Sequence, residues 1–336
     1  MTRLRRSDPH SPGITRVRRG RGFEYRGPDG ARIDDPATVD ALRALAIPPA
    51  WTDVWISPHE NGHILATGTD AAGRRQYIYH PAWQERMANE KFERMLQLAA
   101  VMPAVRGGIT RDLRLDGYGR TRVLAGAFRM LDSALLRVGS EQYARQHGSI
   151  GLVTLRGSHA RVRGGTVVEL RFPGKSGQPW ESDVEDAELA ELITGLKRRG
   201  GRSLLLSWRD DEADRWHPLH AADINDDVRA RTGGDFTAKD FRTLHGTITA
   251  AVALARTGPR GSATARRRAA AAAIRETAAV LGNTPAVARA SYVDPRVIDL
   301  YDEGTTVDPT RRVEGQLIEL LGDDGSRGSR ADGARG

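Results

Sequence analysis

Cysteine is absent from this chain, so neither a disulfide bond nor a thiolate metal site can form. No apolar run approaches the roughly 20 residues needed to span a bilayer. The opening MTRLRRSDPH lacks the apolar stretch of a secretory signal. These absences exclude a disulfide-stabilised scaffold, and we expect a cytoplasmic protein without a membrane partner.

Lysine is almost absent as well. Lys91, Lys175, Lys197 and Lys239 are the four lysines among 51 basic residues, which leaves 47 arginines. Arginine keeps its proton, whereas surroundings can lower the lysine pKa from about 10.4, so of the two only lysine can donate a proton. Lys175 lies in FPGKSG at 172–177, a glycine-flanked turn between two alternating apolar runs. The pattern fits either a solvated turn lysine or a mobile proton donor.

Positive charge is what the chain has in excess. Its 336 residues carry a net charge of +8, and the pI is 10.1. Such a balance indicates a polyanionic partner, with nucleic acid as the first candidate. Because arginines occur throughout, composition alone also fits RNA or an anionic surface. The 39% of hydrophobic residues are typical of a globular protein with room for one large domain or two modest ones.

The first part of the chain predicts a small β-rich domain. Residues 21–80 contain short alternating runs, and GPDG at 27–30 and ENG at 60–62 are hairpin signals. A short helix at about 38–46 interrupts them before Pro48. Residues 1–20 are basic and aperiodic, which predicts a flexible arm.

From about Pro81 the apolar period lengthens to about 3.6, which predicts helices. The first, at 82–102, is long and would connect two domains. Further helices are expected at about 119–137, 140–147, 185–199, 220–231, 238–256, 263–281 and 285–292. Residues 151–184 predict three strands, with turns at 156–158, 164–165 and 173–177, and the tail from about Gly322 predicts disorder.

The expected fold class is therefore α+β with two domains. We expect a small β-rich N-terminal domain and a larger, mainly α-helical catalytic domain with a three-stranded β insertion. The boundaries we predict are a basic arm at 1–20, a β-rich domain at 21–81, a connecting helix at 82–102, a catalytic domain at 103–310 and a C-terminal segment at 311–336.

Three cations stand at helix ends. Arg137 lies off the apolar stripe of helix 119–137, which Gly139 would end, and a helix dipole alone would favour a cation there. Lys239 and Arg242 share one face at the start of helix 238–256, where the dipole prefers anions. Either the acids Asp235 and Asp240 or a phosphate must offset them.

The segment LGNTPAVARASYVDP at 281–295 begins a helix with Thr284 as N-cap and Pro285 as its first residue. Asn283 precedes the helix, and Tyr292 lies two turns further on. Such a tyrosine is either a core residue with a satisfied hydroxyl or a functional group.

Two other patterns carry little weight. GKS at 174–176 is not a P-loop, because Glu169 stands where the leading glycine should be and strands flank the turn. The histidines 217, 220 and 245 lack metal spacing, so a metal-dependent nuclease is weakly supported.

Together these pieces resemble the type IB DNA topoisomerases, above all the small bacterial and poxvirus form. The resemblance covers roughly residues 20–305. It rests on LLRVGSEQY at 135–143, GLVTL at 151–155, FPGKSG at 172–177, KDFRTLHGT at 239–247 and LGNTPAVARASYVDP at 281–295, with IPPAWTDVWI at 47–56 and RRQYIYH at 74–80.

The resemblance implies Tyr292 as nucleophile, with Arg137, Lys175 and Arg242 as catalytic cations. Asn283 stands where many relatives have histidine, so it would only hydrogen-bond a phosphate oxygen. The implied DNA contacts are Gln76, Tyr77, Tyr79, Gly139, Tyr143 and Lys239. The implied protein is a monomeric, C-shaped clamp on double-stranded DNA in the nucleoid, which relaxes supercoils of both signs through a 3′-phosphotyrosyl bond. The resemblance implies no metal, ATP or other small-molecule cofactor.

Two other classes remain open. A tyrosine recombinase shares this catalytic logic, but it typically begins with a helical domain and has histidine where Lys239 stands. A basic DNA-binding protein without catalysis is the third class, and it would leave Tyr292 without a function.

Overall fold

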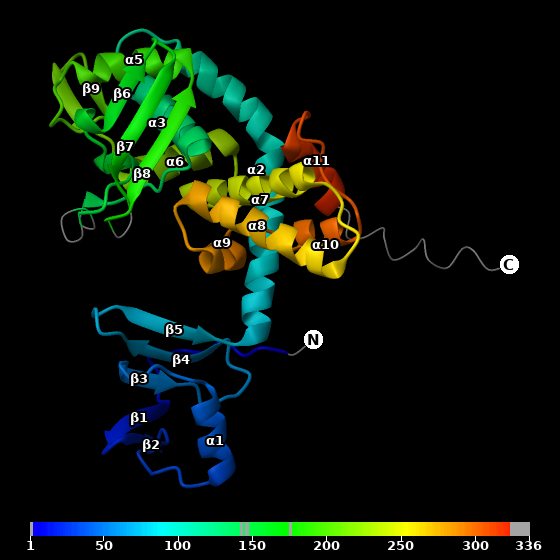
Figure 1. Ribbon diagram of the computed structural model, residues 1–336. Coiled ribbons are helices and arrows are strands. Elements are labelled where there is room, and N and C mark those ends of the chain that lie inside the picture. The colour runs from blue at the N-terminus through cyan, green and yellow to red at the C-terminus, as the bar shows by residue number, and fades with distance from the viewer. Residues whose placement is uncertain (1–2, 142–143, 145–147, 175–176, 323–336) are drawn as a thin grey trace. The chain divides into compact units, whose positions relative to one another are not determined.

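The computed structural model describes residues 3–141, 144, 148–174 and 177–322. The chain divides into two compact units, Met1–Lys91 and Phe92–Gly336 (Figure 1). The boundary falls inside one long helix, α2, which spans Pro81–Leu113.

The first unit is built on a five-stranded antiparallel sheet with the order β2-β1-β3-β4-β5. Its strands are β1 (Ile14–Arg19), β2 (Gly22–Arg26), β3 (Thr52–Ile56), β4 (Ile64–Thr69) and β5 (Arg75–Tyr79), with helix α1 (Pro36–Ala44) between β2 and β3. The carboxylate of Asp35 caps α1 by accepting the Thr38 N–H at 2.8 Å. A small core forms around Ile56 and Ala66. The turn predicted at 60–62 is confirmed, since the Gly62 N–H donates to the His59 carbonyl.

The flexible-arm prediction for residues 1–20 is wrong over much of its length. Residues 14–19 form β1, and Ile14 is buried in the core. Further upstream, the Arg5 N–H donates to the Asn61 carbonyl at 2.8 Å, and the Ser7 hydroxyl donates to the Ile64 carbonyl at 2.9 Å. Backbone pairing orders this segment, and such pairing leaves little trace in a sequence whose outward positions are arginines.

Helix α2 is longer than the predicted 82–102. It continues through Pro103 to Leu113. Proline removes one backbone hydrogen bond and normally ends a helix. Here Val105, Ile109 and Leu113, which follow the proline, are buried, so packing outweighs the local penalty.

The second unit is mostly helical. After α2 come α3 (Arg120–Ala134), α5 (Ala187–Lys197), α6 (Ala221–Thr232), α7 (Ala238–Thr257), α8 (Ala263–Leu281), α9 (Pro285–Ser291), α10 (Arg296–Asp302) and α11 (Val313–Leu321). Helices α5 to α9 follow the predicted ranges closely, whereas the short helices α10 and α11 were not predicted. The chain thus combines a small β-sheet unit with a larger, mostly helical unit, as expected from the sequence.

Two small sheets accompany these helices. The strands β6 (Ala160–Arg163), β7 (Val167–Pro173) and β8 (Pro179–Glu185) form an antiparallel sheet in that order. Residues 152–154 form a short 3-10 helix, so the strand-like pattern of GLVTL was misleading. The hairpin of β9 (Ser207–Asp210) and β10 (Arg215–Pro218) was missed, because its acidic turn hides the alternation.

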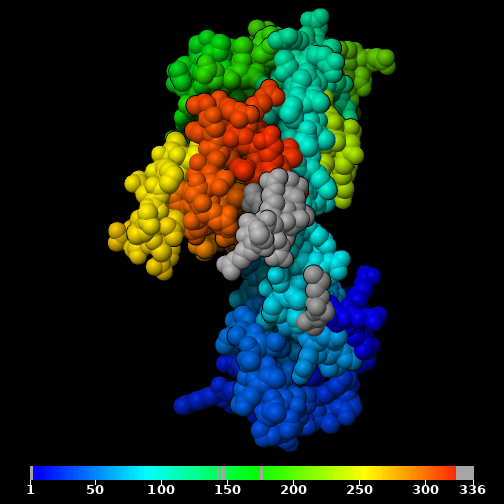
Figure 2. All heavy atoms as spheres, turned by 90° about the vertical axis from the view of Figure 1, so that its right-hand side faces the viewer, coloured from blue at the N-terminus to red at the C-terminus, as the bar shows by residue number. Residues whose placement is uncertain are grey.

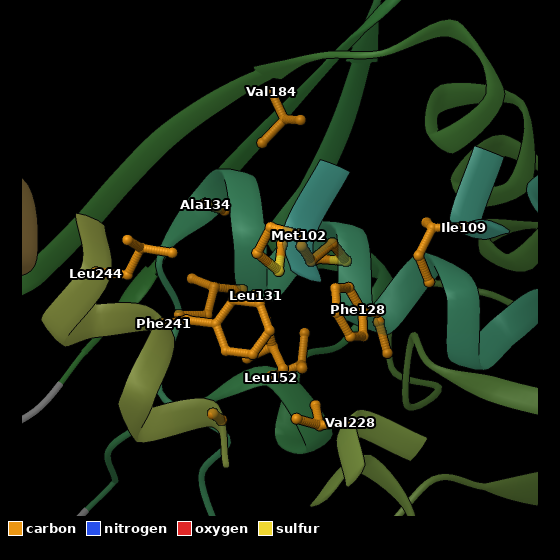
Figure 3. Close-up of a cluster of buried hydrophobic side chains, with 14 of the residues drawn as sticks. Met102, Ile109, Phe128, Leu131, Ala134, Leu152, Val184, Val228, Phe241 and Leu244 are labelled. Carbon is orange, nitrogen blue, oxygen red and sulfur yellow. The ribbon is translucent and has the colours of Figure 1, made fainter. Parts of the chain in front are cut away.

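The main core brings α2, α3 and α7 together (Figure 3). Phe128 of α3 meets Phe241 of α7 edge to face, with ring centroids 5.1 Å apart. Figure 2 shows the C-terminal helices, in orange and red, against the blue-green part of α2. An ion pair of 2.7 Å between Arg106 of α2 and Glu314 of α11 joins them. Within the residues described, no helix combines the length and apolarity that crossing a membrane requires.

Candidate active site

A cavity of about 310 Å³ in the second unit is lined by four of the predicted site residues. Its lining residues are Arg137, Val138, Asn225, Thr237, Ala238, Lys239, Arg242 and Tyr292. These residues come from the segment after α3, from α6, from the start of α7 and from the end of α9. The fold therefore brings Arg137, Lys239, Arg242 and Tyr292 together, although they span more than 150 positions of sequence.

Tyr292 caps the C-terminal end of α9 and is half-buried, so it is not the core tyrosine that the sequence left open. Its N–H donates to the Ala288 carbonyl at 2.9 Å, and its own carbonyl accepts the Thr247 hydroxyl at 3.3 Å. A Cβ on Gly246 would lie 2.5 Å from that carbonyl oxygen, so α7 lies directly on the tyrosine backbone. The phenol ring consequently lies 5.2 Å from the guanidinium carbon of Arg242.

Arg242 is a buried cation, with 3% of its surface exposed. It donates to the carbonyls of Leu135 and Leu281, both at 2.6 Å, while its Nε has no partner. Burial, reinforced by repulsion from Arg137, lowers the pKa of Arg242 to about 10. The guanidinium is still charged at neutral pH, and among the described residues it has no carboxylate partner.

Arg137 lies beyond the helix in which it was predicted. Helix α3 ends at Ala134 because Leu135 adopts a left-handed conformation, with φ of 55°. Arg137 then donates to the Gly282 carbonyl at 3.1 Å and to Oδ1 of Asn283 at 2.7 Å. Burial lowers the pKa of Arg137, and the nearby Tyr292 acts in the opposite direction.

Carboxylates do not neutralise these cations in the part of the chain that is described. The acids Asp235 and Asp240, which were the alternative to phosphate, pair with Arg94 at 3.9 and 3.0 Å. Lys239 is exposed and has no ion pair within the same residues. A buried guanidinium and a half-buried one, with no carboxylate partner among the described residues, are costly unless an anion joins them, so the cavity has the chemistry of an anion site.

Asn283 adds a donor to this site. Its Oδ1 accepts from Arg137, which leaves the Nδ2 amide buried without a partner. Nε of Arg242 is unpaired as well. Buried polar atoms are rarely left without a hydrogen bond, so both are available to oxygens of a bound anion.

The remaining predicted residues differ in their placement. Lys175 and Tyr143 lie outside the described residues. Gly139, with φ of 78°, follows Val138 beside the cavity, and a Cβ on it would lie 2.9 Å from the Cα of Gly151. Its role as a DNA contact stays a prediction.

In the first unit, Gln76, Tyr77 and Tyr79 lie on the edge strand β5. The amide of Gln76 donates to Asp70 at 2.8 Å. The rings of Tyr77 and Tyr79 stack at 5.8 Å on one face of the strand, and Tyr77 is 45% exposed. Neither ring is buried, and the contact of both rings with DNA stays a prediction.

Three residues of the site were missed from the sequence. Thr237 caps α7 together with Asp240, and the spacing of a capping box could have revealed it. Asn225 lines the cavity from α6, and Thr247 holds the backbone of Tyr292. Neither differs from an ordinary helical polar residue in sequence.

Comparison with known proteins places this geometry in a family. Residues 81–304 match the profile of the eukaryotic DNA topoisomerase I catalytic core. Residues 22–70 match that of the bacterial DNA topoisomerase IB N-terminal domain. The chain belongs to the type IB DNA topoisomerase family. It is thus a type I DNA topoisomerase, and every residue that lines the cavity lies within the catalytic-core match.

Viral topoisomerases are similar in sequence to this enzyme, some over most of its length and others over part of it. DNA topoisomerase 1B of Acanthamoeba polyphaga mimivirus is 32% identical over 295 residues, which is 86% of this chain and 87% of the relative. DNA topoisomerase 1 of rabbit fibroma virus is 22% identical over 90% of this chain and 97% of the relative. DNA topoisomerase 1B of vaccinia virus, strain Copenhagen, is 24% identical over 42% and 46%.

Proposed function

We propose that this topoisomerase cleaves one strand of duplex DNA by transferring the phosphate to Tyr292. The phenol oxygen attacks the phosphorus, a new 3′-phosphotyrosyl bond forms, and the bond to the 5′-oxygen breaks. The free 5′ end can then rotate, which relaxes supercoils of either sign. Attack by the 5′-hydroxyl reverses the reaction and restores the strand. One phosphodiester replaces another, so the proposed step requires neither ATP nor a metal.

The observation that carries this proposal is a buried guanidinium, of Arg242, and a half-buried one, of Arg137, in one cavity with the half-buried Tyr292. Arg137 and Arg242 would neutralise the two non-bridging oxygens as negative charge builds on the pentacoordinate phosphorus. The guanidinium carbon of Arg242 lies 5.2 Å from the centre of the Tyr292 ring, so the cation is already beside the attacking group. The unpaired amide of Asn283 would donate to a phosphate oxygen.

Lys175 completes the proposed catalytic set. A departing 5′-oxygen needs a proton, whereas Arg137 and Arg242 would be engaged with the non-bridging oxygens. Lys175 would deliver that proton. Lys239, Gly139 and Tyr143 would contact DNA near the cleaved bond, and Gln76, Tyr77 and Tyr79 would contact it from the first unit.

The proposed architecture is a monomeric clamp. We propose that the unit around β1–β5 serves as a cap that encloses duplex DNA together with the catalytic domain and its three-stranded insertion. Enclosure would retain the unbonded strand end while the covalent bond exists. The enzyme would act in the nucleoid, where its substrate lies.

The decisive experiment incubates supercoiled plasmid with the full chain in the absence of magnesium and ATP, and compares Tyr292→Phe with the wild type. We expect a ladder of relaxed topoisomers and a denaturation-resistant protein–DNA adduct from the wild type. Tyr292→Phe should bind duplex normally but form no adduct. Tyr118→Phe, which alters another half-buried tyrosine outside the cavity, is the matched control. Recombinant products would favour the recombinase, and an adduct with Tyr292→Phe would exclude this nucleophile.

A further inference from the structure

Helix α2 places three charged side chains against the segments that carry the proposed catalytic residues. Glu93 contacts Arg296 at 2.9 Å, shortly after Tyr292 in the chain. Arg94 contacts Asp240 at 3.0 Å, between Lys239 and Arg242. Arg106 contacts Asp132 at 2.7 Å, and Asp132 also lies 2.9 Å from His245, one turn after Arg242. None of the three side chains of α2 lines the cavity.

Arg94 fixes the N-terminal end of α7. Its guanidinium donates to the carboxylate of Asp240 and to the backbone carbonyl of Asp235, and it lies over the ring of Phe236 at 5.8 Å. The same carboxylate accepts the Thr237 N–H at 2.8 Å, which caps the helix. Because the cap sets where the first turn begins, Arg94 determines where Lys239 and Arg242 project into the cavity.

Glu93 reaches the other side of the site through one intermediate. Arg296 donates to both carboxylate oxygens of Asp294, at 3.1 and 2.8 Å, as well as to Glu93. Asp294 is fully buried, two residues after Tyr292, and its N–H donates to the Thr247 hydroxyl at 3.1 Å. The segment with the nucleophile is thus attached both to α7 and to α2.

We propose that Arg94 and Glu93 are positioning residues, which hold the cations of α7 and the nucleophile Tyr292 in one geometry for attack. They touch neither substrate nor reacting atoms. Glu93 and Arg94 are neighbours on helix α2, and they bind the segment after Tyr292 and the start of α7. A shift of either segment would therefore break a contact with the same helix. This inference rests on the proposed function. Helix α2 also begins at Pro81 in the first unit, so the support for the active site and the link between the units are one element.

The test measures single-turnover formation of the covalent adduct by the full chain on a duplex oligonucleotide, at saturating protein. Arg94→Gln should slow adduct formation about tenfold, since misplacement by about 1 Å can cost up to about 10²-fold in rate. Cleavage and religation should slow together, because both need the same alignment. Glu93→Gln should have a smaller effect, since Glu93 is 55% exposed. Arg94→Lys, which can still pair with Asp240, should restore most of the rate.

The matched control is Arg86→Gln. Arg86 pairs with Glu90 at 3.0 Å on the same helix, is 70% exposed and is not among the residues that line the cavity. DNA affinity and melting temperature should be the same for Arg94→Gln, Arg86→Gln and wild type. If Arg94 had a merely structural role, Arg94→Gln would lower one or both. Rates for Arg94→Gln equal to those of the control would overturn the inference, and so would a slow rate that appears only with lost affinity or stability. A wild type without adduct would instead refute the proposed function.

Discussion

Arginines that are buried or half-buried occur in two regions of this enzyme, and their partners differ. In the cavity, the hydrogen bonds that Arg137 and Arg242 make to described residues go to carbonyl and amide oxygens. On α2, Arg106 lies between two carboxylates, of Asp132 and Glu314, both at 2.7 Å. The carboxylates of Asp132 and Glu314 neutralise the charge of Arg106, whereas the charges of Arg137 and Arg242 are not neutralised by a described carboxylate. Unneutralised charge weakens a fold, so the difference separates residues that stabilise the protein from residues poised for an anion.

The largest effect should follow from removing a cavity cation. Arg137→Ala is expected to slow adduct formation by about 10²–10³-fold, the usual loss when one donor to a developing oxyanion is removed. Because no carboxylate depends on Arg137 within the described residues, the melting temperature should change little. Single-turnover kinetics and thermal unfolding of the same samples check both halves. A lowered melting temperature with normal kinetics would place Arg137 with the structural arginines.

The second largest effect should follow from removing a carboxylate that pairs with Arg106, and it should change stability instead of catalysis. Asp132→Asn should lower the free energy of unfolding by about 3 kcal/mol at pH 7, because a buried ion pair loses one partner while Arg106 keeps Glu314. Burial raises the pKa of Asp132, but the hydrogen bonds from His245 and Arg106 outweigh it and hold this pKa well below 3.8. A lowered pKa gives stability that is complete above the unfolded value and is lost as the pH falls through the folded value.

The difference in free energy of unfolding between wild type and Asp132→Asn should therefore stay constant from pH 7 to about 5. It should become smaller only below pH 3.8. Urea unfolding at several pH values measures it. Asp40→Asn, which removes an exposed partner of Arg43, is the control and should change stability little. A difference that vanishes already near pH 6 would contradict a lowered Asp132 pKa as its source.

The smallest effect concerns the exposed cation of the cavity. Lys239→Gln should weaken duplex binding modestly and similarly for different sequences, since a phosphate contact carries no base information. The slope of log affinity against log salt should fall by about 0.9, the value for one phosphate contact. Titrations at several salt concentrations give the slope, with Arg86→Gln as the control. An unchanged slope would remove Lys239 from the DNA contacts.

Local chemistry explains which parts of this molecule could be predicted. Thr284 and Pro285 start α9 where expected, and so Asn283 and Tyr292 were correctly placed around it. The period of α7 likewise put Lys239 and Arg242 on one face. Sequence could not reveal that Leu135 leaves the helix, because that conformation is held by tertiary contacts such as the bond from Arg242 to its carbonyl.

The other errors have the same origin. Packing carries α2 through Pro103, and pairing with residues 61–64 orders the arm that composition marked as flexible. The sequence could not show which arginine would pair with a carboxylate, since Arg106 within α2 and Arg137 just after α3 are two among 47 arginines. In each case the outcome depends on contacts with residues that are distant in the sequence.

The contact between Gly139 and Gly151 has a consequence for mutational tolerance. A Cβ on Gly139 would lie 2.9 Å from the Cα of Gly151, and a Cβ on Gly151 would lie 2.6 Å from the Cα of Gly139. Most clashes in a protein can be relieved by trimming the opposing side chain, but here the opposing residue has none to trim. Natural drift and laboratory libraries thus have no compensating change at the partner position, and the loop bearing Arg137 has little freedom to diversify.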